Sequence, residues 1–329
     1  MDEIPQRVRE QLTRLLGRID DVAVITKGLS RSSVLRIQSL QGTYAVKQYP
    51  NTDFALEKLC RIHHFQRSVV SGGFDKLPQL LDWPDGQSLL ADQDSWWELC
   101  SWRPGEPTAS LGEITTDQLC NAMKSIAQFH KVCKSIGPTQ QPSPGLEFRL
   151  RSLAQPILNL EDRRLLEIRR DPQVAGLIEA IARHSQYRLR DLQYSVQRLA
   201  MKKWECHWIL RDIWRAHVLF ENEQVSGVID LGASGVDTPM LDVTRLLGTL
   251  ITPGDGRWST MVQLYCNESQ QDFDLDTIRV LDEASTFLSG RNWLMWLVAG
   301  DIQLKNAENG ARERWAEIQR KLTDYQLQS

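Results

Sequence analysis

The chain has 329 residues, of which 41% are hydrophobic and 25% are charged, and its formal net charge is -3. This length allows two lobes with separate cores, and the composition is that of an ordinary soluble protein. The charge excludes a global basic field for nucleic acid or a membrane surface, and no apolar run reaches the roughly 20 residues of a membrane span.

The N-terminus and the cysteines indicate the compartment. The first residues, MDEIPQRVREQL, are polar and amphipathic and contain no apolar signal core. The six cysteines are scattered and form no C-x-x-C pair, which is typical of reduced thiols rather than of a disulfide framework or a zinc site. We therefore expect a cytoplasmic protein with no membrane span and no nucleic-acid partner.

The first part of the chain is expected to form a helix, an antiparallel sheet and a second helix. Apolar residues at helical spacing predict a helix over 4–16. Strand-like runs separated by turns fill residues 22–49. Capping residues precede a helix over 54–67, and further strands are predicted over 77–80, 87–90 and 96–102.

The second part is expected to be mainly helical. Thr116 can cap a strong helix, and His130 lies on the apolar face of that helix, where a core histidine is favoured over a catalytic one. Residues 147–203 are helical in pattern and rich in arginine, which is typical of a solvated helix surface. Further helices are predicted over 277–288 and 292–304, with a last helix that places Trp315 and Leu322 on one face.

The most informative stretch reads LRDIWRAHVLFENEQVSGVIDLG and covers residues 210–232. Asp212 and Asp230 stand at the ends of two strand-like runs that are joined by a turn at 221–223, so a hairpin would bring its ends together. Phosphoryl transfer needs such a pair of carboxylates. One orients the attacking hydroxyl, and the other holds the magnesium ion that bridges the phosphates of ATP.

This stretch resembles the aminoglycoside phosphotransferase and choline kinase branch of the kinase-like fold. That branch reads H-G-D-x-x-x-x-N, a hydrophobic hairpin, I-D-F-G, and then Pro and a further Asp. The corresponding residues here are Leu210-Arg211-Asp212, His217, Ile229-Asp230-Leu231-Gly232, Pro239 and Asp242. The resemblance implies that Asp212 is the catalytic base, that Asp230 is a metal ligand and that Asp242 is a buried anchor for the catalytic loop.

Two departures from the family pattern concern the same loop. Leu210 replaces a histidine that usually supports the loop, and His217 replaces the asparagine that usually helps to bind a second metal ion. Residues 211–219 also resemble the lipopolysaccharide kinases, whose loop R-D-x-Y-x-x-H-F-x carries a histidine at the metal position in active enzymes. His217 could weaken one magnesium site, favour manganese, leave a one-metal mechanism, or hydrogen-bond Asp212. Arg215 could stabilise the transferring phosphoryl group or form a surface salt bridge.

The resemblance also implies roles for residues upstream. The turn at 27–33 would lie over the phosphates, Lys47 would contact the α- and β-phosphates, and Glu57 would pair with Lys47. The adenine would hydrogen-bond backbone near residues 100–102. Each feature also has a simpler interpretation. The turn at 27–33 fits an ordinary hairpin, Lys47 a solvated lysine and Glu57 a surface glutamate. The strand over 96–102 fits a plain edge strand. The predicted cofactor-binding residues are Gly28, Ser30, Ser32, Lys47, Glu57, Cys100 and Trp102.

The sequence therefore predicts an α+β, two-lobed protein-kinase-like fold. An antiparallel-sheet lobe would cover residues 1–102 and a mainly helical lobe 103–329, with ATP and Mg²⁺, or Mn²⁺, between them. Asp212 and Arg215 are the predicted catalytic residues, and His217 and Asp230 the predicted metal ligands. The expected enzyme moves the γ-phosphoryl group of ATP to a hydroxyl of a small, sugar-like molecule.

Two alternatives and the acceptor remain open at this stage. The R-D-x-W-x-x-H loop also fits a kinase for a lipopolysaccharide or glycolipid sugar, and Leu210 with His217 fits a pseudokinase that binds or scaffolds without transfer. Because residues 147–203 lean basic, a neutral or anionic acceptor is favoured over a polycationic aminoglycoside. The sequence does not indicate the oligomeric state.

Overall fold

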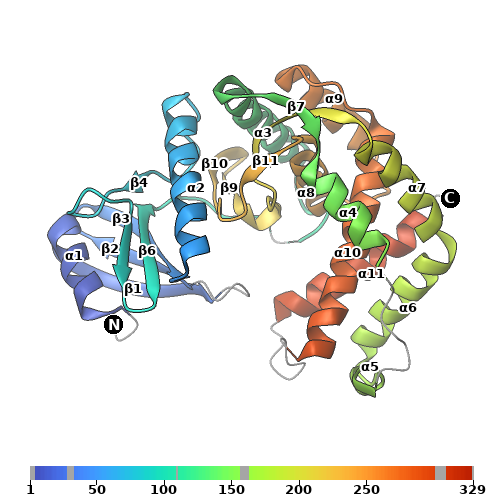
Figure 1. Cartoon of the computed structure of the whole chain (residues 1–329), viewed down its shortest axis with the longest axis horizontal. Helices are drawn as coiled ribbons and strands as arrows, with labels where there is room; N and C mark the ends of the chain where they lie inside the picture. The colour runs from blue at the N-terminus through green and yellow to red at the C-terminus, as the bar shows by residue number, and fades with distance from the viewer. Residues whose placement is uncertain (1–3, 28–32, 109, 156–162, 301–308, 328–329) are drawn as a thin grey trace. The chain divides into compact units, whose positions relative to one another are not determined.

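The computed structural model describes residues 4–27, 33–108, 110–155, 163–300 and 309–327. The chain forms two compact units (Figure 1). Unit 1 consists of Met1–Pro107 and Ala216–Gly235, and unit 2 consists of Thr108–Arg215 and Val236–Ser329. Each unit is thus assembled from two separate pieces of the chain.

Unit 1 contains a six-stranded antiparallel sheet in the order β1-β2-β3-β6-β4, with β5 also paired to β6. In the pairing of β3 with β6, Lys47 lies opposite Glu98 and Ala45 opposite Cys100, so these side chains share one face of the sheet. The strands are β1 (Ile19–Lys27), β2 (Ser33–Ser39), β3 (Gly42–Pro50), β4 (Leu80–Leu81), β5 (Leu89–Asp92) and β6 (Ser95–Ser101).

Helices complete the core of unit 1. Helix α1 (Gln6–Leu16) contributes Val8 and Leu12 to a buried cluster with Val46, Trp97 and other strand residues. Helix α2 (Asp53–Ser71) begins after Thr52, whose side chain accepts a hydrogen bond from the Ala55 N–H and so satisfies one free backbone donor of the first turn. The predicted helix over 54–67 is thus present and extends one turn further.

The predicted hairpin is also present and belongs to unit 1. Strand β9 (Val218–Glu221) pairs with β10 (Gln224–Val228) around a turn in which Asn222 adopts a left-handed φ of 54°. Glu106 forms a β-bridge to Phe220. Gly105 permits this approach, because its φ is 103° and a Cβ atom there would lie 2.7 Å from the Phe220 carbonyl oxygen.

Unit 2 is mainly helical and carries a three-stranded sheet in the order β11-β8-β7. Its strands are β7 (Thr139–Pro142), β8 (Lys203–Ile209) and β11 (Gly235–Asp237). A short 3₁₀ helix, η1 (Arg215–His217), spans the point at which the chain passes from unit 2 to unit 1. The helices are α3 (Thr116–Ile136), α4 (Pro144–Leu153), α5 (Arg163–Ile168), α6 (Pro172–Tyr187), α7 (Leu189–Ala200), α8 (Met240–Leu250), α9 (Trp258–Ser269), α10 (Leu275–Ala299) and α11 (Asn309–Leu327).

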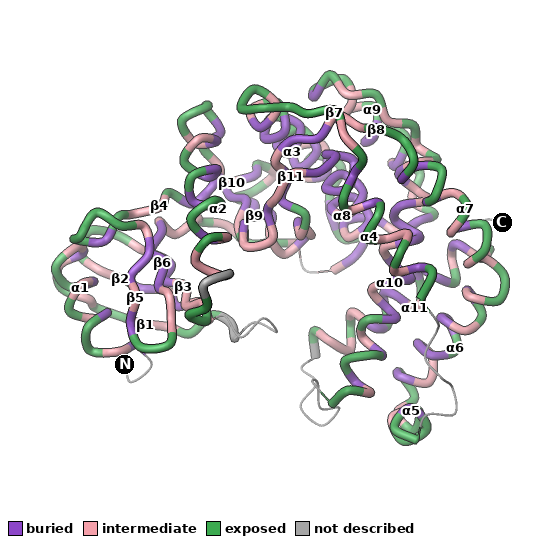
Figure 2. Tube along the Cα trace, viewed as in Figure 1, coloured by how far each residue is buried: buried purple, intermediate pink, exposed green. Residues whose placement is uncertain are grey.

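The core of unit 2 forms where α10 and α11 pack against α6 and α7. Leu177, Phe287, Trp315 and Leu322 belong to this cluster, and Figure 2 shows α3 and α8 buried over much of their length. Helix α10 runs unbroken through residues 289–291, so the predicted division into helices over 277–288 and 292–304 is wrong. Gly290 does not interrupt it, because this glycine packs against Ile181 and Ile318. None of the described helices is apolar enough over a sufficient length to cross a membrane.

Candidate active site

Lys47 and Asp230 come together in unit 1. The Lys47 Nζ atom lies 3.8 Å from Asp230 Oδ1, and the side chains are 16% and 51% exposed. Both line a pocket of about 320 Å³ that is partly open to solvent, together with Tyr49, Glu98, Cys100 and apolar residues of α2. The pocket thus combines a cation, carboxylates and an apolar wall, as small-molecule sites commonly do.

The charges in this pocket keep Lys47 protonated. Burial by itself would lower the pKa of Lys47, but the carboxylates of Glu98 and Asp230 act against burial, and that pKa lies above its ordinary value. Burial raises the pKa of the Tyr49 phenol well above 10, so the phenol is neutral at physiological pH and the two carboxylates supply the charge. Burial also opposes ionisation of Asp230, yet Lys47 and His217 lower its pKa. A cation and an anion therefore face each other at neutral pH.

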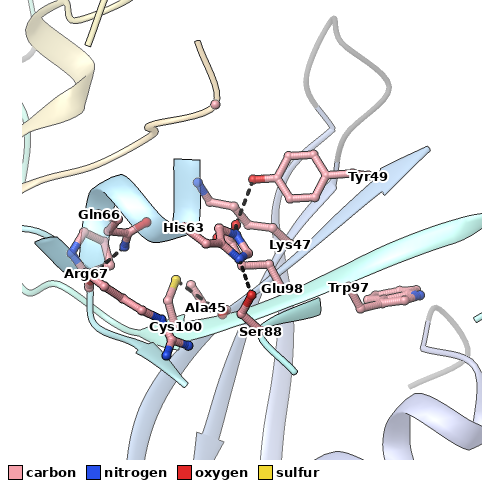
Figure 3. Close-up of polar contacts among 12 residues, drawn as sticks. Ala45, Lys47, Tyr49, His63, Gln66, Arg67, Ser88, Trp97, Glu98 and Cys100 are labelled. Atoms are coloured by element: carbon pink, nitrogen blue, oxygen red, sulfur yellow. Dashed lines mark hydrogen bonds and ion pairs between the residues drawn. The ribbon is translucent and has the colours of Figure 1, made fainter. Parts of the chain in front are cut away.

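A buried polar network lies behind Lys47 (Figure 3). Glu98 Oε2 accepts a hydrogen bond from the Tyr49 hydroxyl at 3.3 Å and lies 2.8 Å from His63 Nε2. The other ring nitrogen of His63 lies 2.7 Å from Ser88 Oγ. Burial raises the pKa of Glu98, but His63 and Lys47 outweigh burial and lower it. Glu98 is thus a buried carboxylate held in one orientation on the face of the sheet that carries Lys47.

The expected pair of Glu57 with Lys47 is wrong. Glu57 is exposed on α2, and its carboxylate lies 3.8 Å from Arg61. Glu57 and His63 are six residues apart, which is about 240° around a helix, so they point to different sides of α2. His63 shares the buried side with Leu59 and Ile62. This apolar stripe is readable in the sequence and could have identified His63 as the α2 residue that faces the sheet.

His217 and Asp230 meet at the open end of the hairpin. The Ile229 N–H donates to the His217 carbonyl at 2.9 Å, and His217 Nε2 lies 3.6 Å from Asp230 Oδ2. Asp230 adopts a φ of 64°, a left-handed conformation that residues with side chains rarely occupy and that is enriched at functional sites. No group of three or more metal-ligand side chains occurs among the described residues. A carboxylate of this kind suits Mg²⁺, which commonly takes one or two carboxylates together with substrate phosphates, whereas imidazole suits softer metals.

Asp242 anchors the loop that carries Asp212 in unit 2. Asp242 is fully buried, and its two oxygens accept the N–H groups of Leu210 and Arg211, each at 2.7 Å. His130 Nε2 lies 3.2 Å from the same carboxylate, and its Nδ1 lies 2.7 Å from the Tyr265 hydroxyl. The expected roles of Asp242 as an anchor and of His130 as a core histidine are confirmed. Because Asp242 holds the Leu210 backbone, this contact to the loop does not depend on a histidine side chain at position 210.

Asp212 itself is half exposed and forms an ion pair with Arg245 of α8. No local sequence pattern marks Arg245, because 33 residues separate it from Asp212. The structure thus places Arg245 of α8 beside the carboxylate of the predicted catalytic loop.

Arg215 does not face a substrate, contrary to the expected catalytic role. Its guanidinium is buried and donates to both oxygens of Glu317 on α11, at 2.7 and 3.0 Å, and its N–H donates to the Thr249 hydroxyl. The alternative of a salt bridge is therefore the correct one, although the bridge is buried rather than on the surface. Such a bidentate pair holds Arg215 to α11.

The remaining predicted nucleotide contacts are placed as follows. Cys100 lines the pocket beside Lys47, and burial raises the pKa of its thiol to about 12. The Ser101 N–H donates to the Gln79 carbonyl and the Trp102 N–H to the Thr43 carbonyl, so these two donors are already used within the sheet. Gly28, Ser30 and Ser32 lie outside the described residues.

Comparison with known proteins decides the family. The model of the phosphotransferase enzyme family (APH) matches residues 21–278, which include Lys47, Asp212 and Asp230. The chain belongs to this family. Because this is a family of phosphotransferase enzymes, the chain is a phosphotransferase. The comparison with curated protein sequences gives no match.

Solved structures support the same fold for this phosphotransferase. Spectinomycin phosphotransferase APH(9)-Ia, solved with ADP and spectinomycin, has a TM-score of 0.64 at 12% identity, over 96% of this chain and 98% of that one. ADP-bound APH(2'')-Ib has a TM-score of 0.54 at 14% identity, over 97% and 98%. The macrolide 2'-phosphotransferase MphH of Brachybacterium faecium has a TM-score of 0.54 at 13% identity, over 95% and 98%. The predicted kinase-like α+β fold is thus confirmed.

Proposed function

We propose that this phosphotransferase moves the γ-phosphoryl group of ATP to a hydroxyl of a small molecule. The proposal rests on the ion pair in the pocket of unit 1, where Lys47 Nζ lies 3.8 Å from Asp230 Oδ1. A buried lysine that stays protonated beside a carboxylate is the arrangement that cradles nucleotide phosphates and their metal ion. The ADP-bound structures with the same fold support ATP as the donor.

The proposed roles follow from the geometry within each unit. In unit 1, Lys47 binds phosphate oxygens, and Asp230 with His217 holds Mg²⁺ or Mn²⁺. The metal ion supplies charge neutralisation on the phosphates. In unit 2, Asp212 orients the acceptor hydroxyl and receives its proton, while Arg245 forms an ion pair with this carboxylate and holds its position. Glu57 and Arg215 have no part in this proposal.

We further propose an acceptor that is neutral or anionic rather than polycationic. The solved structures named above concern spectinomycin, aminoglycosides and a macrolide, and their identities of 12–14% establish the fold and not a shared acceptor. The arginine-rich segment 147–203 favours an acceptor without multiple positive charges. The cysteines, which are all free thiols, fit a reducing, cytoplasmic setting.

Thermal unfolding with ATP and either Mg²⁺ or Mn²⁺ tests the nucleotide site. A ligand that binds only the folded state stabilises it by about 2.7 kcal/mol at a hundredfold excess over Kd. We expect metal-dependent stabilisation of the wild type, its loss in Asp230→Ala, and its retention in Asp212→Asn. Asp212→Asn should still lose about 10³-fold or more in turnover of an accepted substrate, because the hydroxyl is no longer oriented.

The same experiment separates the alternatives. If neither metal nor ATP stabilises the wild type, the nucleotide proposal is wrong. Stabilisation without turnover of any neutral, anionic or glycolipid acceptor would favour a pseudokinase, for which Leu210 and His217 were the original indication.

A further inference from the structure

Unit 2 contains a second pocket, enclosed by α8, α10 and α11. Its empty volume is about 450 Å³, which includes space that is open to solvent. Its polar lining includes Arg245 and Thr249 of α8, Ser285 and Ser289 of α10, and Arg314 and Lys321 of α11.

The charged groups of this pocket are not evenly matched. Lys321 is neutralised, because Asp282 lies 2.7 Å from its ammonium and the Gly248 carbonyl lies at 2.8 Å. Glu317 uses both of its oxygens on Arg215. A terminal nitrogen of Arg314 lies 3.5 Å from Glu317 Oε2, which is a long distance at the outer limit of a hydrogen bond. One carboxylate therefore serves two arginines, and positive charge remains at Arg314.

Arg314 is held in place by packing as well as by charge. Its guanidinium stacks over the Trp214 ring, 4.4 Å from the centroid, and the side chain is 19% exposed. A rigid, partly dehydrated guanidinium loses little entropy when it binds an oxyanion. Burial, together with the nearby Arg245 and Arg215, lowers the pKa of Arg314 to about 10. Arg314 remains charged at neutral pH, and an added anion would relieve the crowding of like charges.

Arg245 connects the pocket with the proposed base. One terminal nitrogen of Arg245 contacts Asp212, while the Nε atom has no hydrogen-bond partner among the described residues. The same side chain lines the pocket. Arg245 thus joins the lining of the pocket to the carboxylate of Asp212 through a single side chain.

Hydroxyl groups provide the rest of the polar lining. Thr249, Ser285, Thr286 and Ser289 contribute side-chain hydroxyls on α8 and α10. Hydroxyls both donate and accept hydrogen bonds, so they suit a ligand that itself carries several hydroxyl groups. The pocket thus offers two arginines for an oxyanion and neutral partners for a polyol.

We propose that this pocket binds the anionic group of the acceptor, and that the acceptor is a hydroxylated carboxylate or phosphate such as a sugar acid or a sugar phosphate. Arg245 and Arg314 select the oxyanion, and the acceptor hydroxyl is thereby directed to Asp212. This inference rests on the proposed function, because it names the class of acceptor for the same reaction.

Acceptor binding is measured without nucleotide, so that its result does not depend on the ATP site. Isothermal titration at constant ionic strength compares glucose 6-phosphate and gluconate with glucose as the neutral control and glucosamine as the cationic control. Inorganic phosphate is a further probe that reports on the oxyanion alone. We expect at least one of the two hydroxylated anions to bind about tenfold or more tightly than glucose and glucosamine. Equal binding of all sugars, or a preference for glucosamine, would overturn the proposal.

Matched variants locate the binding. Arg245→Gln and Arg314→Gln should each weaken binding of the preferred anion about tenfold to a hundredfold, the range of a lost hydrogen bond to a charged group. Arg314→Lys should recover part of the affinity, because it keeps the charge. Arg320→Gln is the control, since it removes the same charge from an exposed position of the same helix. The unliganded thermal midpoint checks that each variant folds.

Two outcomes separate this inference from the proposed function. Anion binding that is equally weak in Arg320→Gln and in the two pocket variants would overturn the pocket while leaving the ATP result intact. Absence of ATP stabilisation together with arginine-dependent anion binding would instead overturn the proposed function and leave an anion site in unit 2.

Discussion

At the scale of single residues, the carboxylate beside Lys47 comes from the sheet and not from the expected position on α2. Glu98 is 6% exposed and is held by Tyr49 and His63, whereas Glu57 is exposed and reaches only Arg61. A buried carboxylate that loses its charge leaves its hydrogen-bonded partners poorly compensated, whereas an exposed i,i+4 pair contributes only a few tenths of a kcal/mol.

Glu98→Gln is therefore expected to lower the free energy of unfolding by about 2 kcal/mol, and Glu57→Gln by less than about 0.5 kcal/mol. Urea unfolding at neutral pH measures both. Because the pKa of Glu98 is lowered in the folded state, its contribution is present above the ordinary carboxyl range and is lost as pH falls through that range. The difference between wild type and Glu98→Gln should thus shrink in acid. Equal effects of the two substitutions would contradict this assignment.

His207 gives unit 2 a sensitivity to acid. Burial, together with the neighbouring His130, lowers the pKa of this fully buried histidine to about 4. The unfolded chain binds the proton near pH 6.5 and the folded chain does not, so stability falls as pH decreases from about 6.5 toward 4, by up to roughly 3 kcal/mol.

Replacement of His207 by Gln should flatten this part of the stability profile, because glutamine does not titrate. Urea unfolding between pH 7 and pH 4 measures the slope, and His64→Gln, at an exposed position of α2, is the control. A slope that is the same in wild type and His207→Gln would show that other groups cause the acid sensitivity.

At the scale of elements, α8 depends on close approach to α10 and α11. A Cβ atom at Gly248 would lie 2.6 Å from the Asp282 carboxyl carbon and 3.1 Å from Lys321 Nζ. Asp282 cannot move aside easily, because Lys321 contacts one oxygen at 2.7 Å and the Tyr325 hydroxyl contacts the other at 2.5 Å. The glycine thus permits a buried ion pair at the floor of the second pocket.

We expect Gly248→Ala to lower the free energy of unfolding by about 2 kcal/mol, the cost typical of overpacking. Gly310→Ala is the matched substitution, since Gly310 is exposed in α11 and a Cβ atom there meets nothing within 4 Å. It should raise stability by about 0.5 to 1 kcal/mol through helix propensity. Thermal or urea unfolding distinguishes these opposite signs, and the same sign for both would argue against close packing at Gly248.

At the scale of the whole molecule, unit 1 is completed by a segment from the second half of the chain. Phe220 and Glu106 exchange backbone hydrogen bonds at 2.9 and 3.0 Å, and Arg103 donates to the Ser226 carbonyl. The same segment supplies Asp230 to the pocket of Lys47. If residues 216–235 were removed, the buried residues of unit 1 that pack against them would be exposed to solvent.

A fragment of residues 1–107 is expected to be less stable than the same fragment joined by a flexible linker to residues 216–235. The joined form restores the hairpin and the Lys47–Asp230 pair, so its urea midpoint should be higher. A fragment of residues 1–102 tests the contiguous lobe boundary that the sequence analysis predicts at residue 102. If 1–102 were as stable as the joined form, the hairpin would contribute nothing to unit 1.

The sequence by itself determined the kinase-like α+β fold, the hairpin of residues 218–228 and the identity of Lys47, Asp212 and Asp230 as candidates. Strand and helix periodicity predict the elements, whereas the kinase-like fold and the three candidates follow from the resemblance of a short motif to a known family. The same local reasoning divided α10 wrongly, because packing against Gly290 is not visible in the sequence.

Only the tertiary structure decided which charges meet. Glu98 with His63, Arg245 with Asp212, and Arg215 with Glu317 join residues that are 35, 33 and 102 positions apart. An ion pair of this kind depends on how helices and strands pack, and the separation of its members in the chain carries no signal of it. The packing thereby assigned Arg215 to a structural role and brought Arg245, which no motif marked, to the carboxylate of Asp212.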